Sequence, residues 1–238
     1  MNRRRPIVAI DGPAGSGKTT VSRAVAHQLG YVVLDTGALY RAVALSTARA
    51  GLEPSNPTFE RHCRELLARR AIVLEAEANG QSRVWLDGED VSKAIRTPEN
   101  SQRTSVVSAD STLRAVLLDL QRQLGREGGV VVEGRDIGSV VFPDAEAKFF
   151  LTASVERRAK RRHSELRASA VEPTLEDVEQ QVRERDERDT HRTTAPLLQA
   201  PDATLLDSTN LSIDQVVDAI VREVRAIEAG PGPVSSES

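Results

Sequence analysis

The sequence predicts an α/β fold: a doubly wound, five-stranded parallel sheet flanked by helices, with a small antiparallel β-containing insert and a short helical lid. Two observations predict the parallel sheet. Short apolar runs without polar alternation are typical of strands buried on both faces, and segments with helical spacing of apolar residues lie between them. A third observation predicts the insert, because Asn79-Gly80 joins two β-type segments and favours a two-residue hairpin turn.

The first fifty residues make the first unit of this fold. Residues 7–10 predict a buried strand, and residues 18–29 predict a helix that Gly30 ends. Residues 31–34 predict a second strand, and a second helix follows over 38–50. A strand, a helix and a strand within about thirty residues make a βαβ unit, which implies parallel strands.

Residues 51–95 show a β-hairpin pattern instead of the alternation of strands and helices seen in the rest of the chain. Segments 71–74 and 83–86 flank the hairpin turn, and Asp87-Gly88 predicts a second turn. We expect Trp85 to pack in the core of this insert.

Helices and strands then alternate again. The predicted elements are, in chain order, a helix over 113–126, strands over 130–132 and 148–151, a helix capped by Ser154 that runs to about 168, a helix from 173–174 to about 189, a strand over 204–206 and a helix capped by Ser212 that runs from 213 to about 228. We expect one domain over 6–229, with its core at 6–50 and 111–229, the insert at about 51–105 and the lid at about 158–190, followed by a disordered tail over 230–238.

The composition excludes several classes of protein. The 238-residue chain is 39% hydrophobic and 28% charged, as in globular domains, and its net charge of -3 argues against nucleic-acid binding. A single cysteine, Cys63, excludes a disulfide framework and a cysteine-based zinc site and fits a reducing compartment. No apolar run is long enough for a membrane span, and no secretory segment follows the basic start. We therefore expect a cytoplasmic monomer without nucleic-acid or membrane partners.

Residues 12–19, Gly-Pro-Ala-Gly-Ser-Gly-Lys-Thr, match the phosphate-binding pattern G-x-x-x-x-G-K-[ST] in full and are called the phosphate loop here. Glycines let the backbone bring its N–H groups against phosphate oxygens, and the helix that follows points its N-terminus at the same anion. Lys18 would reach the β- and γ-phosphates, and the Thr19 hydroxyl would bind Mg²⁺. A strand–helix turn without a ligand is the alternative, which the full match disfavours. The predicted ATP-binding residues are Gly12, Pro13, Ala14, Gly15, Ser16, Gly17, Lys18, Thr19 and Thr20.

Positively charged side chains follow the predicted strands. Tyr40 and Arg41 lie one helical turn past the second strand, and Arg135-Asp136 follows the third strand between two glycines. Because ligands on doubly wound sheets bind at the carboxyl ends of the strands, we expect these residues at one edge. An ion pair within a turn is the alternative for Arg135 and Asp136.

Two predicted helices carry stripes of arginine. Arg185, Asp189 and Arg192 share one helix face at i, i+4 and i+7, and Arg158 and Arg162 stand at i, i+4 on the preceding helix. Solvated surface ion pairs are one interpretation, and a lid that closes over bound phosphates is the other.

Many arginines without an evident general base favour an acceptor that is itself a phosphate. Two phosphate-bearing substrates repel each other, since like unit charges 4 Å apart cost about 4 kcal/mol at an effective dielectric of 20. A sugar alcohol would need a base to take its proton, whereas a phosphate monoester with a second pKa of about 6 is already an oxyanion at pH 7.

Five segments carry a family resemblance: Ile10-Asp-Gly-Pro-Ala-Gly-Ser-Gly-Lys-Thr19, Leu34-Asp-Thr-Gly-Ala-Leu-Tyr-Arg41, Gly134-Arg-Asp-Ile-Gly138, Arg185-Asp-Glu-Arg-Asp-Thr-His-Arg192 and Leu206-Asp-Ser-Thr209. With these segments the chain resembles the bacterial cytidylate kinases, a family of P-loop nucleoside monophosphate kinases, from about Ile7 to Val221. The hairpin-bearing insert fits the resemblance, because adenylate kinases carry a helical one. The sequence departs from the family at Glu133, where aspartate is usual, and at residues 107–111, which lack an aromatic–Pro or His–Pro pair.

The resemblance implies transfer of the γ-phosphoryl group of ATP to CMP, and to dCMP, with Mg²⁺. It implies that Ser105, Arg114 and Asp136 contact the cytosine, where a carboxylate can accept from the exocyclic amine that uracil lacks. The other implied contacts are Arg185 and Asp189 with the sugar hydroxyls, Tyr40, Arg41, Arg135 and Arg192 with the acceptor phosphate, Thr36 with the acceptor nucleotide, and Lys18, Arg158 and Arg162 with the transferring phosphoryl group. The implied catalytic residues are Lys18, Arg135, Arg158, Arg162 and Arg192.

Two other functions stay open on the sequence alone. One is a P-loop kinase of another nucleotide or metabolite, such as UMP, AMP or shikimate. The other is a nucleotide-dependent switch, which would bind the triphosphate and transfer no phosphoryl group to any small acceptor.

Overall fold

The computed structural model of the chain describes residues 3, 5–76, 82–168 and 173–230. The expected hairpin turn at Asn79-Gly80, much of the turn between the lid helices and nearly all of the expected tail lie outside the described residues.

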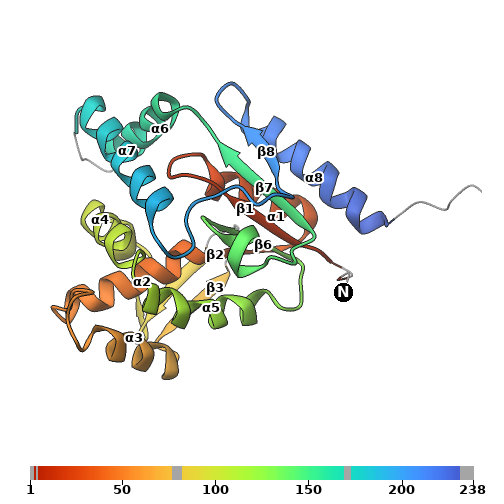
Figure 1. Cartoon of the computed structure of the whole chain (residues 1–238). Coiled ribbons are helices and arrows are strands. Elements are labelled where there is room, and N and C mark those ends of the chain that lie inside the picture. The colour runs from red at the N-terminus through yellow and green to blue at the C-terminus, as the bar shows by residue number, and fades with distance from the viewer. Residues whose placement is uncertain (1–2, 4, 77–81, 169–172, 231–238) are drawn as a thin grey trace, which may run out of the picture.

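A five-stranded parallel sheet in the order β2-β6-β1-β7-β8 forms the centre of the molecule (Figure 1). The central strand β1 is buried along its whole length, as its unbroken apolar run predicts. Asp11, the last residue of β1, pairs in register with Gly134 of β6, so the loops after these two strands leave the sheet side by side. The predicted parallel sheet is confirmed, and its strands are β1 (Ile7–Asp11), β2 (Val32–Asp35), β6 (Val130–Gly134), β7 (Ala147–Thr152) and β8 (Thr204–Asp207).

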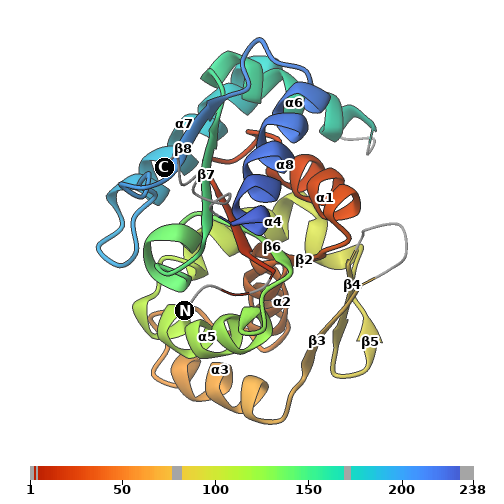
Figure 2. The same cartoon turned by 90° about the vertical axis from the view of Figure 1, so that its right-hand side faces the viewer.

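Helices cover both faces of the sheet (Figures 1 and 2). On one face α1 (Lys18–Leu29) and α8 (Ile213–Ala229) pack their apolar sides against Val8 and Ile10 of β1. On the other face Ile7 and Ala9 contact a single π-helical turn, η2 (Ile137–Val141), which apolar spacing alone does not predict.

The helix α2 (Thr36–Arg49) begins two residues before its predicted start. The Asp35 carboxylate accepts a hydrogen bond from the Ala38 backbone N–H at 3.0 Å and thereby caps the helix at its true N-terminus. The helix α5 (Ser111–Gly125) is likewise capped by Asp110, which accepts from Leu113 N at 2.8 Å.

The insert is an antiparallel sheet in the order β3-β4-β5 together with helices that the sequence did not predict. Its core is formed by Ile72, Val84 and Leu86, packed against α2 and α5. The expectation that Trp85 belongs to this core is wrong: strand alternation turns Trp85 to the face of half-exposed Val73, where its Nε1 donates to Glu75 at 3.0 Å. The elements are α3 (Phe59–Ala68), β3 (Ile72–Ala76), β4 (Ser82–Leu86), β5 (Glu89–Asp90), η1 (Ala94–Arg96) and α4 (Pro98–Val107).

The expected lid corresponds to α6 (Val155–Ala168) and α7 (Leu175–His191), which pack side by side through a small apolar cluster of Ala159, Leu166 and Val178. Thr174 caps α7 in a reciprocal capping box with Asp177. The division of the chain into core, insert and lid stays an interpretation. Within the described residues, the helices lack the combination of length and apolar character that crossing a bilayer requires.

Candidate active site

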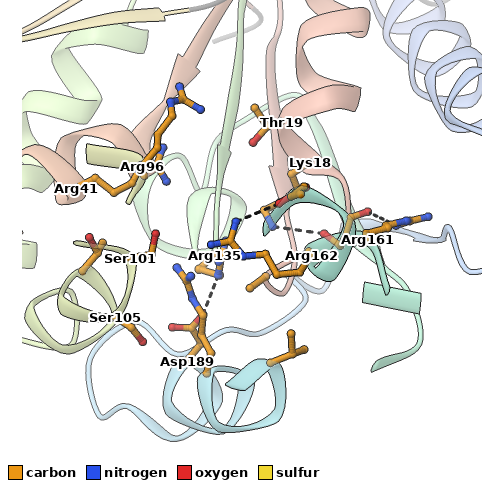
Figure 3. Close-up of a pocket in the computed structure, with 18 of the residues that line it drawn as sticks. Lys18, Thr19, Arg41, Arg96, Ser101, Ser105, Arg135, Arg161, Arg162 and Asp189 are labelled. Carbon is orange, nitrogen blue, oxygen red and sulfur yellow. Dashed lines mark hydrogen bonds and ion pairs between the residues drawn. The ribbon is translucent and has the colours of Figure 1, made fainter. Parts of the chain in front are cut away.

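A cleft of about 1820 Å³ lies at the carboxyl ends of the central strands, between the insert and the lid (Figure 3). The phosphate loop lines one end of it, and residues from α2, α4, α5, α6, α7 and the loop after β6 line much of the rest. Three predicted site residues, Gly12, Pro13 and Arg158, do not line it. The predicted residues that it brings together are Ala14, Gly15, Ser16, Gly17, Lys18, Thr19, Thr20, Thr36, Tyr40, Arg41, Ser105, Arg114, Arg135, Asp136, Arg162, Arg185, Asp189 and Arg192.

The phosphate loop has a backbone that only glycine adopts easily. Gly12, Gly15 and Gly17 have φ values of 149°, 75° and 97°. A Cβ on Gly12 would lie 2.0 Å from the carbonyl oxygen of Leu151 in β7, so the loop is packed directly against the neighbouring strand. The glycines therefore fix both the curvature of the loop and its place on the sheet.

Lys18 is held inside this loop. Its side chain is buried and its Nζ donates to the Pro13 carbonyl at 2.7 Å. Burial, and then the nearby guanidinium of Arg135, lower the pKa of Lys18 well below its ordinary value. An anion bound in the cleft would favour the charged form of Lys18 and so offset both effects, as expected for a lysine that binds phosphate.

Beside Lys18, Thr19 and Glu133 form an oxygen-rich corner. The Thr19 hydroxyl donates to Oε2 of Glu133 at 2.9 Å, and Oε1 of Glu133 is buried without a hydrogen-bond partner among the described residues. Burial, followed by repulsion from Asp35, raises the pKa of Glu133 to about 7. Hydroxyl and carboxylate oxygens are the ligands that Mg²⁺ prefers, and an orphaned buried oxygen fits a hydrated ion held mainly by the nucleotide.

The far end of the cleft is organised around Asp136. Its carboxylate accepts from Arg114 in a buried ion pair and from Arg192 at 3.4 Å. Arg114 also lies over the ring of Tyr40, with 5.4 Å from its Cζ to the ring centroid. The Oγ of Ser105 is buried and has no hydrogen-bond partner within the part of the chain that the structure describes. This end thus offers a carboxylate, guanidinium groups and a free hydroxyl to a polar ligand.

A second buried ion pair joins the loop after β6 to the lid. Arg135 Nε donates to Asp189 at 2.8 Å. Burial alone would raise the pKa of Asp189, but Arg135 and Arg185 together hold it below its usual value. Burial, and then repulsion from Arg135, lower the pKa of Arg185 to about 10. The centre of the cleft therefore carries more positive charge than its carboxylates balance.

Two residues of α2 are bonded to the carboxyl ends of two different strands, β2 and β6. Arg41 forms an ion pair with Asp35 at 2.7 Å, and Figure 3 shows Arg41 beside Arg96 on the insert side of the cleft. The Thr36 hydroxyl donates to the backbone carbonyl of Glu133 at 2.7 Å.

The two predicted arginines of α6 differ in their surroundings. Arg162 lines the cleft and pairs with Glu165 at 3.1 Å. Arg158 is buried at the base of the lid, where it donates to the Ala153 and Ala14 carbonyls and pairs with Asp186 at 2.7 Å. Its contact with a transferring phosphoryl group stays a prediction, and in this structure it ties the phosphate loop to both lid helices.

Sequence reasoning missed Arg96, Arg161 and Ser101, which also line the cleft. Arg161 donates to the Ser16 carbonyl at 3.0 Å and to the Ser208 carbonyl at 2.9 Å, next to the phosphate loop. Its place one turn from Arg158 on a basic helix was the available signal. Arg96 and Ser101 lie in η1 and α4, whose presence the sequence pattern did not predict.

Comparison with known proteins bears on the identity of this cleft. The sequence model of one family, cytidylate kinase, matches residues 8–226. The chain belongs to the cytidylate kinase family. It is 51% identical over 232 residues to the cytidylate kinase of Geobacter sulfurreducens, covering 97% of each chain, and 50% identical to that of Syntrophotalea carbinolica, covering 94% and 93%. The resemblance inferred from the motifs is thus confirmed.

Other relatives of the cytidylate kinase family extend the comparison. A bifunctional pantoate ligase/cytidylate kinase of Synechococcus is 46% identical and covers 94% of this chain, which corresponds to 41% of that longer protein. Among solved structures, an uncharacterized protein from Eubacterium ventriosum shares the fold, with a TM-score of 0.52 at 12% identity, covering 93% of this chain and 98% of its own.

Proposed function

We propose that this chain transfers the γ-phosphoryl group of ATP to CMP, and also to dCMP, giving ADP and the corresponding cytidine diphosphate. The observation that carries the proposal is a single cleft with a phosphate loop at one end and an arginine–carboxylate cluster at the other, in a chain of the cytidylate kinase family. The two ends suit a nucleoside triphosphate donor and a phosphate-bearing acceptor.

The donor would occupy the phosphate loop. The start of α1, with Lys18, lines the cleft, and a helix N-terminus beside a lysine supports binding of the β- and γ-phosphates there. Thr19 and Glu133 would hold Mg²⁺ on the nucleotide, with Glu133 in the position where aspartate is usual in the family. When bound, the ion neutralises charge that develops on the β- and γ-phosphate oxygens.

The acceptor would occupy the end around Asp136. We assign the cytosine to Ser105, Arg114 and Asp136, because these offer a hydroxyl, a donor and an acceptor to the polar edge of a pyrimidine. We assign the sugar hydroxyls to Arg185 and Asp189. The residues that would bind the acceptor phosphate are Tyr40, Arg41, Arg135 and Arg192, and Thr36 would lie beside the acceptor nucleotide.

The transfer itself needs position and charge rather than a protein nucleophile. An oxygen of the CMP phosphate forms a bond to the γ-phosphorus while the bond from that phosphorus to the β–γ bridging oxygen breaks, and ADP leaves with the electron pair. Lys18, Arg135, Arg162 and Arg192 all line the cleft and would stabilise the equatorial oxygens. Closure of the lid would exclude water and so limit hydrolysis of ATP.

A panel of acceptors tests this function. Purified protein with Mg²⁺ and ATP is assayed for ADP formation with CMP, dCMP, UMP, AMP and shikimate in turn. We expect CMP and dCMP to turn over fastest, because cytosine presents to Asp136 an exocyclic amine that uracil and shikimate lack, and adenine carries its amine on a larger, purine ring. Faster turnover with AMP or shikimate would overturn the proposal, and triphosphate binding without transfer to any acceptor would favour the nucleotide-dependent switch.

The remaining expectations belong to the same proposal: a monomer that works in the cytoplasm on free nucleotides. Sedimentation velocity of the purified protein with and without both nucleotides tests the first of them.

A further inference from the structure

Asp11 is a buried carboxylate with an unusual pair of partners. It is the last residue of β1 and directly precedes the phosphate loop, yet its two oxygens point to the neighbouring strand's loop. Oδ1 accepts from the backbone N–H of Ile137 and Oδ2 accepts from that of Gly138, both at 2.8 Å. Among the described residues it forms no salt bridge, so backbone amides alone replace its hydration.

These two amides belong to the segment that carries the acceptor residues. Ile137 and Gly138 begin the π-turn η2, directly after Arg135 and Asp136, and we call residues 134–138 the acceptor loop. The turn is closed by Val140 N and Val141 N donating to the carbonyl of Asp136 at 2.9 and 3.1 Å. A carboxylate that holds two successive amides fixes the orientation of the peptide groups between them, and therefore the direction in which the preceding side chains leave the backbone.

The consequence is a rigid connection between the two ends of the cleft. On one side of Asp11 the chain enters the phosphate loop at Gly12, and through Asp11 the acceptor loop is bound to the same point of β1. Arg135 and Asp136 then reach outward to Asp189, Arg114 and Arg192. Beside the backbone pairing of Asp11 with Gly134, this one side chain therefore connects the two ends of the cleft.

Only a carboxylate satisfies this arrangement. Two N–H donors need two acceptor oxygens, whereas an asparagine amide supplies one acceptor and sets its own N–H₂ against the second donor. A Cβ on Gly138 would make an ordinary contact with Oδ2 of Asp11 at 3.5 Å and a tighter one with the stem of Lys148 at 3.2 Å, so Asp11 lies directly against this glycine. Burial, partly offset by the two amide hydrogen bonds, raises the pKa of Asp11 to about 6. At neutral pH the charge therefore lowers folding stability, which is typical of a residue that serves a site.

We propose that Asp11 is a positioning residue for the acceptor: by holding the amides of Ile137 and Gly138, it fixes Arg135 and Asp136 at the distance from the phosphate loop that in-line transfer requires. The inference rests on the proposed function for the identity of the acceptor. It adds a residue that contacts neither nucleotide and acts through the backbone of the acceptor loop.

The test is Asp11→Asn, studied in the full chain with steady-state kinetics and ATP binding. We expect kcat/KM for CMP to fall about 10- to 100-fold, as for a misplacement of about 1 Å. The Kd for Mg²⁺–ATP should change less than about threefold, because the phosphate loop keeps its own contacts. The ratio of ADP to CDP formed should rise above one, since a misplaced acceptor leaves the γ-phosphoryl group to water.

Glu146→Gln is the matched control. Glu146 is also a largely buried carboxylate that accepts from β1, through Ile7 N at 3.0 Å, but at the end of the strand away from the cleft. We expect this variant to lose thermal stability while kcat, KM for CMP and the product ratio stay unchanged.

The outcomes separate the two proposals. If the unaltered protein transfers no phosphoryl group to CMP, the proposed function is wrong. If the unaltered protein is active, but Asp11→Asn has the same kinetics and product ratio as Glu146→Gln, the role of Asp11 is wrong. If Asp11→Asn does not fold, Asp11→Glu keeps both acceptor oxygens but lengthens the side chain by one methylene, which displaces the amides of Ile137 and Gly138. A smaller loss confined to CMP kinetics then supports the inference, and unchanged CMP kinetics overturn it.

Discussion

The two ends of the cleft are built in different ways. The donor end is one contiguous segment, residues 12–20, whose shape depends on its own glycines and on the first turn of α1. The acceptor end is assembled from α2, α4, α5, the acceptor loop and α7, which buried ion pairs such as Arg135–Asp189 hold together. A contiguous site carries its geometry locally, whereas an assembled site depends on contacts between distant segments. Substitutions at the donor end should therefore reduce activity with every acceptor, whereas substitutions at the acceptor end should affect CMP most.

Removing the donor-end cation should have the largest effect. We expect Lys18→Met to lower kcat about 100- to 1000-fold with every acceptor, because the charge on the transferring group loses its nearest ammonium. Lys160→Met, on the exposed side of α6, is the matched control and should keep normal kinetics. A loss limited to CMP would mean that the donor end is not independent of the acceptor.

At the acceptor end, Asp136→Asn should lower kcat/KM for CMP about 10- to 100-fold while Mg²⁺–ATP affinity changes little, because the amide cannot accept from both Arg114 and the cytosine amine as a carboxylate does. Asp202→Asn removes a carboxylate paired with Lys148 at 2.7 Å outside the cleft and should leave these constants alone. Equal losses with CMP, UMP and AMP would show that Asp136 serves structure only.

A smaller effect should separate recognition from stability. Ser105→Ala removes a buried hydroxyl without a partner in the described chain, so we expect KM for CMP to rise about three- to tenfold with little change in Tm. Ser46→Ala breaks a 2.9 Å hydrogen bond to His62 in the insert region, so this variant should lower Tm and leave KM for CMP unchanged. A fall in Tm for Ser105→Ala would place this serine among the structural residues.

The smallest effect concerns Asp11, which connects the two ends of the cleft, and the pH dependence of Tm. Because the pKa of Asp11 is raised from 3.8 to about 6 in the folded chain, its contribution to stability is greatest below pH 4 and is lost as the pH rises through 6. The Tm of the unaltered protein relative to Asp11→Asn should therefore fall by roughly 5 °C between pH 4.5 and 7.5. The pKa of Glu146 is lowered instead, so the Tm of the unaltered protein relative to Glu146→Gln should rise, not fall, as the pH increases. Parallel trends for both variants would contradict the raised pKa of Asp11.

Local patterns predicted most of the fold. Uninterrupted apolar runs identified β1 and β6, and side-chain caps such as Ser212 identified helix starts. The helix α4 escaped notice because its buried residues, among them Asn100 and Thr104, are largely polar and are satisfied by tertiary contacts. Trp85 was misplaced because its size favoured the core, whereas strand alternation gave the inner face to Val84 and Leu86.

The candidate site also has a part that the sequence predicts and a part that it does not. The phosphate loop is visible in the sequence because its chemistry needs eight consecutive residues. The partners of the acceptor residues are not visible, since Arg114 meets Asp136 across 22 positions and Arg135 meets Asp189 across 54. Such pairs follow from the order of strands in the sheet and from how the lid lies on it. The family resemblance supplied these residues where spacing alone did not.

The surplus of guanidinium and ammonium groups in the cleft has a consequence for stability. Lys18 and Arg185 are both less basic than usual, and Arg135 repels both of them. These cations come from the phosphate loop, the acceptor loop and α7, so a polyanion bound among them would offset their repulsion and hold the three segments together. Inorganic sulfate or pyrophosphate should therefore raise the melting temperature of this protein well beyond the effect of chloride at equal ionic strength.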